Sequence, residues 1–329
     1  MVLSAPPRSA PAPQRPKSTK STKSTGLKPR RRIKSATRMD AFAPYMYIAP
    51  FFALFAVFGL FPTVFTFYVA LFDWNPIGGQ TFIGLDNFVT LYGDERFWNA
   101  MRNTFSIWIL STVPQLLLAL FLAQLLNNVR LKFANLFRMT MLVPYITSVV
   151  ATTIVFASLF GRDYGLINSF LNLFGVQSID FAANTFASHI MVSTMVLWRW
   201  FGYNTLIYLA ALQAIPKDIY EAAAIDGAGG FKQFFYVTIP SLRPVIIFTI
   251  IVSTIGGLQV FTEPLLLSAP GLTGGAGRQF QTLSLFMYEQ GFGNFQFGYG
   301  SAIGVTLFAL IVVFSVINYL LSRRITSDE

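Results

Sequence analysis

The chain has 329 residues and a formal net charge of +10, and 54% of its residues are hydrophobic while only 12% are charged. A soluble domain carries roughly 25% charged residues, so the composition excludes an ordinary soluble fold. No cysteine is present, which excludes disulfides, thiolate metal sites and cysteine nucleophiles.

The positive charge is concentrated at the N-terminus. Residues 1–40 contain eleven basic residues and one acid, so the rest of the chain is neutral. This segment is rich in Ala, Pro, Ser and Thr, and we expect it to form a disordered tail. Since basic residues beside an apolar run mark the cytoplasmic side, we expect the tail to stay inside the cell. A nucleic-acid arm would need a groove-reading module, and a cleaved signal peptide would not begin with a long polar segment.

Six apolar runs follow the tail, each about as long as the ~20 residues that span the hydrocarbon core of a membrane. They cover residues 45–72, 104–126, 139–160, 188–212, 245–267 and 301–321. Pro50 and Pro62 interrupt the first run, and a membrane helix tolerates them as kinks. We therefore expect an all-α integral membrane protein with about six transmembrane helices, surrounded by membrane lipids.

The polar connections between the runs predict the orientation. Loop 127–138 holds three basic residues and no acid, whereas loop 73–101 is acidic on balance. By the positive-inside rule the first loop is cytoplasmic, the second is external, and both termini are cytoplasmic. Among the external connections we expect a short interfacial helix at residues 166–174 and a Gly-rich segment at residues 268–299.

The connection between the fourth and fifth runs is too polar to cross a membrane and carries the signals of a short helix. Pro216 suits the first turn of a helix, and Asp218 and Glu221 suit its positive N-terminal end. Gly227 is placed to end the helix with a positive φ. Residues at intervals of three and four form one face: Ile215, Ile219, Ala222 and Ala223.

A second helix is expected to begin near Phe231 and to be limited by Pro240 and Pro244. The two helices would form a compact helix-turn-helix on the cytoplasmic side. Its first helix is suited to docking into a groove of a partner. An ordinary packed loop explains the same pattern.

Residues 221–240 resemble the EAA loop of binding-protein-dependent ABC permeases, which has the pattern E-A-A-x3-G-x9-I-x-L-P. Here Glu221-Ala222-Ala223 precede Gly227 and Val237-Thr238-Ile239-Pro240, with Val237 and Ile239 in place of Ile and Leu. The flanking residues 210–216 are similar to the maltose-type, carbohydrate-importing branch, and the likeness extends over residues 45–324. Residues 268–278 depart from the Thr-x-Gly-Gly-Pro that such permeases usually have.

The resemblance implies the type I ABC importer permease fold, in the plasma membrane. The first transmembrane helix would lie at residues 45–72 and the transmembrane domain at residues 98–321, including a coupling loop at residues 215–240. The implied partners are a cytoplasmic ABC ATPase dimer, a second and different permease subunit, an extracytoplasmic sugar-binding protein, and a di- or oligosaccharide substrate. We expect no nucleic-acid partner.

The resemblance also implies which residues couple the chain to its ATPase. They are Glu221, Ala222, Ala223, Asp226, Gly227 and Pro240. Glu221 would pair with a basic residue of the ATPase, and Gly227 would permit the turn. Because the chain has no G-x-x-x-x-G-K-S/T sequence, we expect ATP hydrolysis on the separate subunit and no enzyme activity here.

The fourth run indicates where a sugar would pass. Arg199 lies near its middle, where a charge costs at least about 2.5 kcal/mol unless it faces a cavity or a partner. Binding sites for small molecules combine aromatic surfaces with a few polar groups. The candidates for the translocation path are Trp198, Arg199, Tyr203, Asn204, Gln259 and Glu263. A structural contact between Arg199 and Glu263 is the alternative, and His189 is better explained as a satisfied or interfacial side chain than as a ligand. We expect no catalytic residue, metal or cofactor.

Two other classes stay open. A secondary transporter also has apolar helices, but it usually contains paired repeats within a longer chain. An ABC permease for another small solute would share the EAA loop. The flanking residues and the long first external loop favour a sugar, and Phe261-Thr262-Glu263-Pro264 resemble permeases for lactose- or cellobiose-like oligosaccharides.

Overall fold

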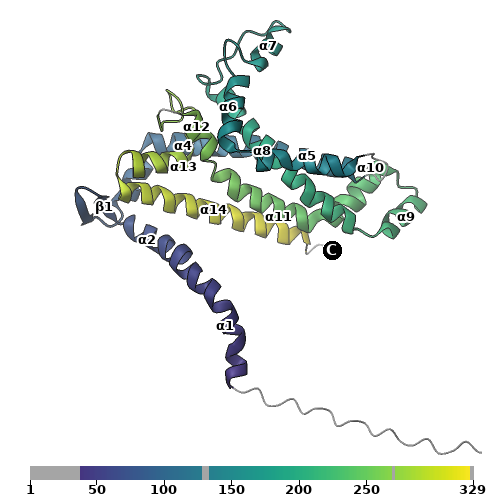
Figure 1. The fold of residues 1–329 in the computed structure, drawn as a ribbon, viewed down its shortest axis with the longest axis horizontal. Helices are drawn as coiled ribbons and strands as arrows, with labels where there is room; N and C mark the ends of the chain where they lie inside the picture. Colours follow the sequence, from purple (N-terminus) through teal and green to yellow (C-terminus); the bar gives the residue numbers. More distant parts are fainter. Residues whose placement is uncertain (1–37, 128–132, 269–270, 327–329) are drawn as a thin grey trace, which may run out of the picture. The chain divides into compact units, whose positions relative to one another are not determined.

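The computed structural model describes residues 38–127, 133–268 and 271–326. The chain divides into two units, Met1–Ala56 and Val57–Glu329. Helix α1 (Arg38–Phe55) belongs to the first unit (Figure 1). It begins inside the predicted tail, because the apolar helix extends backwards through alanine and methionine residues that favour helices. The rest of the predicted disordered tail lies outside the described residues.

A π-helical turn leads into the second unit, which then forms a helix, a β-hairpin and another helix. The bounds are η1 (Ala56–Leu60), α2 (Phe61–Val69), β1 (Phe72–Asn75), β2 (Gly79–Phe82) and α3 (Asp86–Gly93). The strands are antiparallel, with Phe72 opposite Phe82 and Asn75 opposite Gly79. The Asn75 side chain supports the turn by accepting a hydrogen bond from the Ile77 N–H at 3.0 Å. The sequence predicted only a polar loop here.

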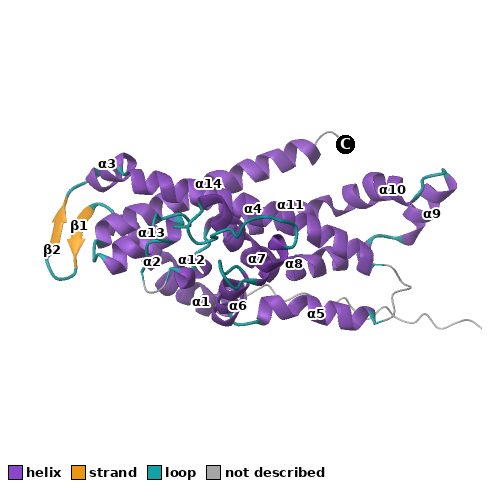
Figure 2. Ribbon diagram, turned by 90° about the horizontal axis from the view of Figure 1, so that it is seen from above, coloured by secondary structure: helices purple, strands orange, loops and turns teal. Residues whose placement is uncertain are grey.

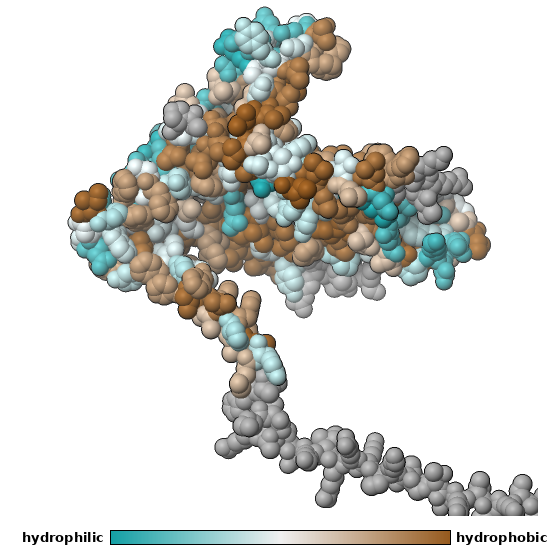
Figure 3. Space-filling model, in the orientation of Figure 1, coloured by the Kyte–Doolittle hydropathy of each residue, from teal (hydrophilic) through white to brown (hydrophobic). Residues whose placement is uncertain are grey.

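Four long helices form the body of the second unit. They are α4 (Glu95–Leu126), α8 (Thr185–Ala214), α11 (Ile239–Leu258) and α14 (Phe297–Thr326). Helix α4 packs along α8 and α11, and α11 packs along α14 (Figures 1 and 2). Buried apolar side chains gather in clusters, one around Phe97, Phe286 and Ile303 and another around Tyr208 and Leu242. Many apolar side chains remain on the surface between the polar ends (Figure 3), as expected for contact with lipid.

The third predicted run, residues 139–160, is a broken helix rather than a continuous one. It forms α5 (Ala134–Ile146) and α6 (Val149–Leu159), which are bent by 92° at the break. Pro144 removes a hydrogen bond from the last turn of α5, and Thr147 has an extended backbone. Helix α5 packs on α8, and α6 contacts both α8 and α7 (Leu166–Asn172), which lies where the sequence predicted a short helix.

Four helices in the described ranges are long and apolar enough to cross a membrane, and the bent pair raises the number to five if it is one span. The four are Tyr45–Val69, Glu95–Leu126, Gly230–Leu267 and Phe297–Leu321. Helix α8 has 30 residues but is more polar, because it carries His189, Arg199 and Asn204. These residues are buried or half-buried among neighbouring helices, so α8 is central in the unit and needs less apolar surface. Each of the six predicted runs is therefore mainly helical, with breaks in the third and fifth. The first helix ends at Val69, three residues before the predicted bound, because Phe72 belongs to β1.

The Gly-rich segment before α14 is packed into the unit. It contains α13 (Leu283–Tyr288) and a π-helical turn η3 (Glu289–Gly293), and Gln281 and Thr282 are completely buried. Arg278 is held by Glu289 through two hydrogen bonds of 2.7 and 3.0 Å. This bidentate pair fixes the segment within the fold.

Helices α5 and α8 cross so closely that Gly202 has no room for a side chain. A Cβ at this position would overlap the carbonyl oxygen of Met141, whereas a Cβ at Gly256 would meet nothing within 4 Å. We expect Gly202→Ala to separate the two helices and lower the yield of folded protein, and Gly256→Ala to leave it unchanged. Size-exclusion chromatography of the solubilised variants measures this difference, and equal monodisperse peaks would contradict the predicted crossing.

Candidate functional site

Three of the six candidate coupling residues, Glu221, Ala222 and Ala223, lie on a short helix at the end of the second unit opposite the hairpin (Figures 1 and 2). Helix α9 (Lys217–Ile225) begins after Pro216 and has Asp218 in its first turn, as predicted. None of its residues is buried. Glu221 and Ala222 are exposed and Ala223 is half-buried. The helix therefore presents its surface outward instead of contributing to the core.

The C-terminal end of α9 has the geometry that the sequence predicted. Gly227 has a φ of 79°, in the left-handed region that glycine adopts without a steric cost. Its N–H donates to the Ala224 carbonyl at 3.1 Å, and the Ala228 N–H donates to the Ala223 carbonyl at 2.9 Å. These two bonds form a Schellman motif, which satisfies the last carbonyls of the helix.

Helix α9 is attached to the next helical segment by polar contacts. The Tyr220 hydroxyl is 3.0 Å from the Thr238 hydroxyl. The Gln233 side-chain amide donates to the Ala228 carbonyl at 3.0 Å and to the Tyr220 carbonyl at 3.4 Å. These contacts connect the short helix to the following segment without burying it.

The second helix of this region does not stop at its prolines, contrary to the prediction. Helix α10 (Gly230–Gln233) continues through a π-helical turn η2 (Phe234–Thr238) into α11. Pro240 lies at the start of α11, where a missing N–H costs little, and Pro244 is accommodated inside it. Pro240 is thus on a different helix from Glu221, Ala222 and Ala223, while Asp226 is the residue that caps α9.

Large apolar side chains are exposed around α9 and α10. Ile225 is 86% exposed, Phe231 79% and Tyr236 80%. The helix-turn-helix thus offers apolar side chains next to the exposed carboxylates of Glu221 and Asp226. This combination is typical of a protein-binding surface.

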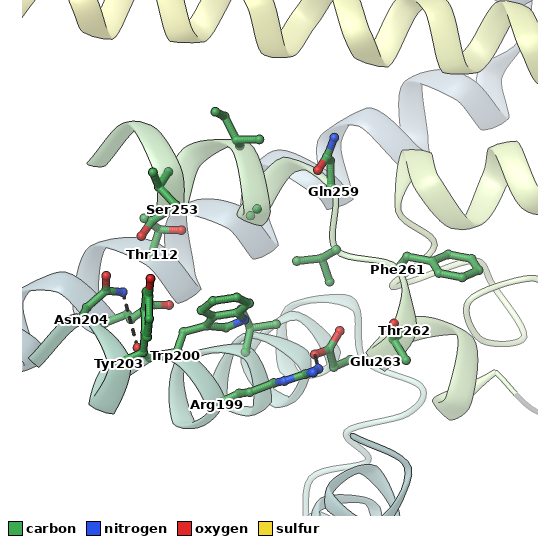
Figure 4. A pocket seen from close by; sticks show the side chains of 17 residues that line it. Thr112, Arg199, Trp200, Tyr203, Asn204, Ser253, Gln259, Phe261, Thr262 and Glu263 are labelled. Carbon is green, nitrogen blue, oxygen red and sulfur yellow. Dashed lines mark hydrogen bonds and ion pairs between the residues drawn. The ribbon is translucent and has the colours of Figure 1, made fainter. Parts of the chain in front are cut away.

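Most of the other candidate residues line a cavity of about 380 Å³. It lies between α4, α8, α11 and the start of α12 (Thr262–Leu267) (Figure 4). Five of the six predicted path residues line it: Arg199, Tyr203, Asn204, Gln259 and Glu263. Trp198 does not line it and packs against Phe156, with ring centroids 5.6 Å apart.

The polar side of the cavity contains an ion pair. Arg199 Nη1 on α8 lies 3.4 Å from Glu263 Oε1 on α12, and the Glu263 side chain is 9% exposed. Arg199 Nε is buried and has no hydrogen-bond partner. The chain is unwound between α11 and α12, which brings Gln259 and Glu263 to the cavity. The contact between Arg199 and Glu263 was the structural alternative in the sequence analysis, and the structure contains it inside the cavity.

Aromatic rings form the other side of the cavity. Trp200, which the prediction did not include, lies between Tyr203 and Arg199 (Figure 4). Its ring is 6.0 Å from that of Tyr203, and Tyr145 of α5 stacks on Tyr203 at 5.1 Å. Helical spacing could have revealed Trp200, because it shares a face with Tyr203 and Asn204 at intervals of three and four. The buried Thr112 and Gln115 of α4 also line the cavity, and no sequence signal indicated them.

His189 has a structural role. Its Nδ1 is 2.8 Å from the Ser106 hydroxyl, and its Nε2 is 2.8 Å from the Gln279 carbonyl. The side chain thus links α8 to α4 and to the Gly-rich segment. In the part of the chain that is described, no three His, Asp or Glu residues are grouped as metal ligands would be.

Comparisons with known proteins place the chain in a family. Residues 104–327 match the family described as "Binding-protein-dependent transport system inner membrane component". The chain is 36% identical to the lactose transport system permease protein LacF of Rhizobium radiobacter, over 85% of this chain and 94% of that protein. It is also 36% identical to the arabinooligosaccharides transport system permease protein AraP of Bacillus subtilis (strain 168), over 85% of this chain and 88% of that one.

The fold is similar to a chain of a bacterial alginate ABC transporter solved in complex with an alginate pentasaccharide-bound periplasmic protein. The TM-score is 0.76 at 23% identity, covering 88% of this chain and 96% of that one. At this identity the likeness concerns the fold.

Proposed function

Since the chain belongs to the family of binding-protein-dependent transport system inner membrane components, we propose that it moves a sugar through the membrane for an importer powered by a separate ATPase. It is a multi-pass membrane permease of an ABC transporter. The proposed cargo is a di- or oligosaccharide. The observation that supports the proposal is the lining of the cavity, in which aromatic rings lie beside an ion pair and side-chain amides. The flat faces of the rings can contact the apolar side of a sugar, and the polar groups can form hydrogen bonds with its hydroxyl groups.

We propose that α9 is the contact through which the ATPase acts on this chain. Its exposed Glu221, Ala222 and Ala223 would dock into a cleft of an ABC ATPase, which is a separate subunit. Closure of an ATPase dimer would then move α9 and, through Tyr220 and Gln233, the continuous helix α10–α11 that borders the cavity. We propose that both termini and α9 are cytoplasmic, in line with the positive charge beside the first apolar run.

The proposed assembly also contains a second, different permease subunit and an extracytoplasmic sugar-binding protein. Affinity purification of the chain from its native membranes, followed by mass spectrometry, tests this composition. We expect an ATPase with a Walker motif and a second permease with an EAA loop in fixed stoichiometry. A chain that is purified alone and transports sugar would contradict the proposal.

Two neighbouring tryptophans give a matched test of the cavity. Trp200 lines it and Trp198 does not. We expect Trp200→Leu to weaken the apparent affinity of uptake about tenfold, the effect of losing roughly 1.4 kcal/mol of contact with the sugar. Trp198→Leu should leave the affinity unchanged in correctly inserted protein. Initial rates of labelled-sugar uptake, normalised to inserted protein, measure both, and equal affinities would remove Trp200 from the path.

A further inference from the structure

We propose that Arg199 and Glu263 act as a charge filter: each neutralises the charge of the other, so that the cavity has no net charge and is selective for uncharged sugars. This inference rests on the proposed function, because it requires that the cavity receive the sugar. It adds a substrate class: neutral sugars over sugars that carry a carboxylate.

The two side chains come from different helices and point toward each other inside the cavity (Figure 4). Glu263 projects from α12 and Arg199 from α8, which places the pair at the point where the helix is unwound between α11 and α12. The side chains are 9% and 27% exposed respectively. The charges are therefore partly removed from water, where electrostatic interactions are stronger than at a surface.

The cavity has no net charge. Of the seventeen described residues that line it, Arg199 and Glu263 alone are charged, and they neutralise each other. A carboxylate that enters would bring an uncompensated charge into a partly desolvated site, which is costly. A neutral sugar meets no such penalty and finds donors and acceptors on Arg199, Glu263, Asn204 and Gln259.

The geometry of the Arg199–Glu263 pair differs from that of the structural salt bridge between Arg278 and Glu289. Arg199 contacts Glu263 through one nitrogen at 3.4 Å and leaves its buried Nε without a partner. The Arg278–Glu289 pair, which fixes the Gly-rich segment, is bidentate at 2.7 and 3.0 Å. Since hydrogen bonds to charged groups are short when they are fully formed, the Arg199–Glu263 contact is weaker than the bidentate pair. The Arg199 side chain is 27% exposed, so its terminal N–H groups keep donor capacity that a hydroxyl group can use.

Neutralising Glu263 should convert the filter into an anion site. Glu263→Gln preserves the size of the side chain and its hydrogen-bonding oxygen but leaves Arg199 as an unmatched cation. The double variant Arg199→Gln, Glu263→Gln removes both charges and restores zero net charge. We expect the single variant to prefer a carboxylate-bearing sugar and the double variant to keep the preference of the wild type.

The test measures binding to the purified full chain in lipid nanodiscs, which avoids the selectivity of a binding protein. The probes are neutral di- and trisaccharides, each paired with its aldonate, the same sugar oxidised to a carboxylate at its reducing end. Saturation-transfer NMR titrations give both affinities. We expect the wild type to bind a neutral sugar at least about tenfold more tightly than its aldonate, and Glu263→Gln to reverse that ratio. The matched control is Asp180→Asn, which removes another 3.4 Å ion pair, to Arg162, outside this cavity.

The outcomes separate the two proposals. A wild type that binds the aldonate as tightly as the neutral sugar, or a Glu263→Gln variant with an unchanged ratio, overturns the filter alone. A double variant that prefers the aldonate also overturns it. A wild type that binds none of the sugars contradicts the proposed sugar site and the filter together.

Discussion

Reversing the charge of Glu221 should abolish ATP-driven sugar uptake and leave the protein folded in the membrane. Glu221 is exposed on α9 and has no ion-pair or hydrogen-bond partner among the described residues. Lysine favours a helix about as well as glutamate, so Glu221→Lys costs the chain little by itself. The loss would arise at the interface, where the proposed basic partner on the ATPase would meet a like charge, which costs several kcal/mol.

The measurement is uptake of labelled sugar in cells that lack the native gene, with the inserted protein quantified in the same membranes. Asp163→Lys is the matched control, because Asp163 is also exposed but lies in the loop before α7, far along the chain from α9. Normal uptake by Glu221→Lys, or equal loss in both variants, would contradict the coupling role.

Gly227→Pro should also abolish uptake, for a different physical reason. Proline holds φ near about −65°, whereas the turn after α9 requires a φ of 79°. Proline also lacks the N–H that donates to the Ala224 carbonyl. The Schellman motif could not form, so α9 would lose its fixed orientation to α10 and transmit no movement.

Milder substitutions in the same turn should reduce uptake less than Gly227→Pro does. Gly227→Ala keeps the N–H, but the left-handed backbone costs a residue with a Cβ about 1–2 kcal/mol, so we expect partial activity. Gly229→Ala is the control, since Gly229 has a φ of −68° and open space around its Cα. Uptake assays should rank wild type and Gly229→Ala above Gly227→Ala, and Gly227→Pro last. An inactive Gly229→Ala would mean that bulk in this loop, and not the positive φ, is the constraint.

Local signals in the sequence predicted much of the molecule. The six apolar runs correspond to helices because their length and composition leave few alternatives in a membrane. Gly227 was placed correctly at the end of α9, since only a left-handed residue ends a helix in this way. Arg199 indicated a cavity, because a charge in an apolar helix needs a polar environment. These predictions depend on long apolar runs or on single residues with strong physical preferences.

The remaining features have no strong signal in any single residue. The β1–β2 hairpin arises where turn residues follow Asn75, but its strands are only four residues each, too short for a periodic signal. Pro240 and Pro244 were expected to limit a helix, yet the π-helical turn η2 and the start of α11 accommodate the first of them. Trp198 was assigned to the path with its neighbours, although its position on α8 turns it toward Phe156. In each of these cases the local sequence allowed the predicted conformation, and the rest of the fold selected a different one.

The central claim is that this chain forms the membrane path of an ATP-driven sugar importer. The most direct test reconstitutes the complex purified through this chain into proteoliposomes, with ATP enclosed and the binding protein and labelled sugar outside. The account predicts that sugar accumulates inside above its external concentration only when hydrolysable ATP is present. Accumulation without ATP that follows an imposed ion gradient would contradict the account and identify a secondary transporter instead.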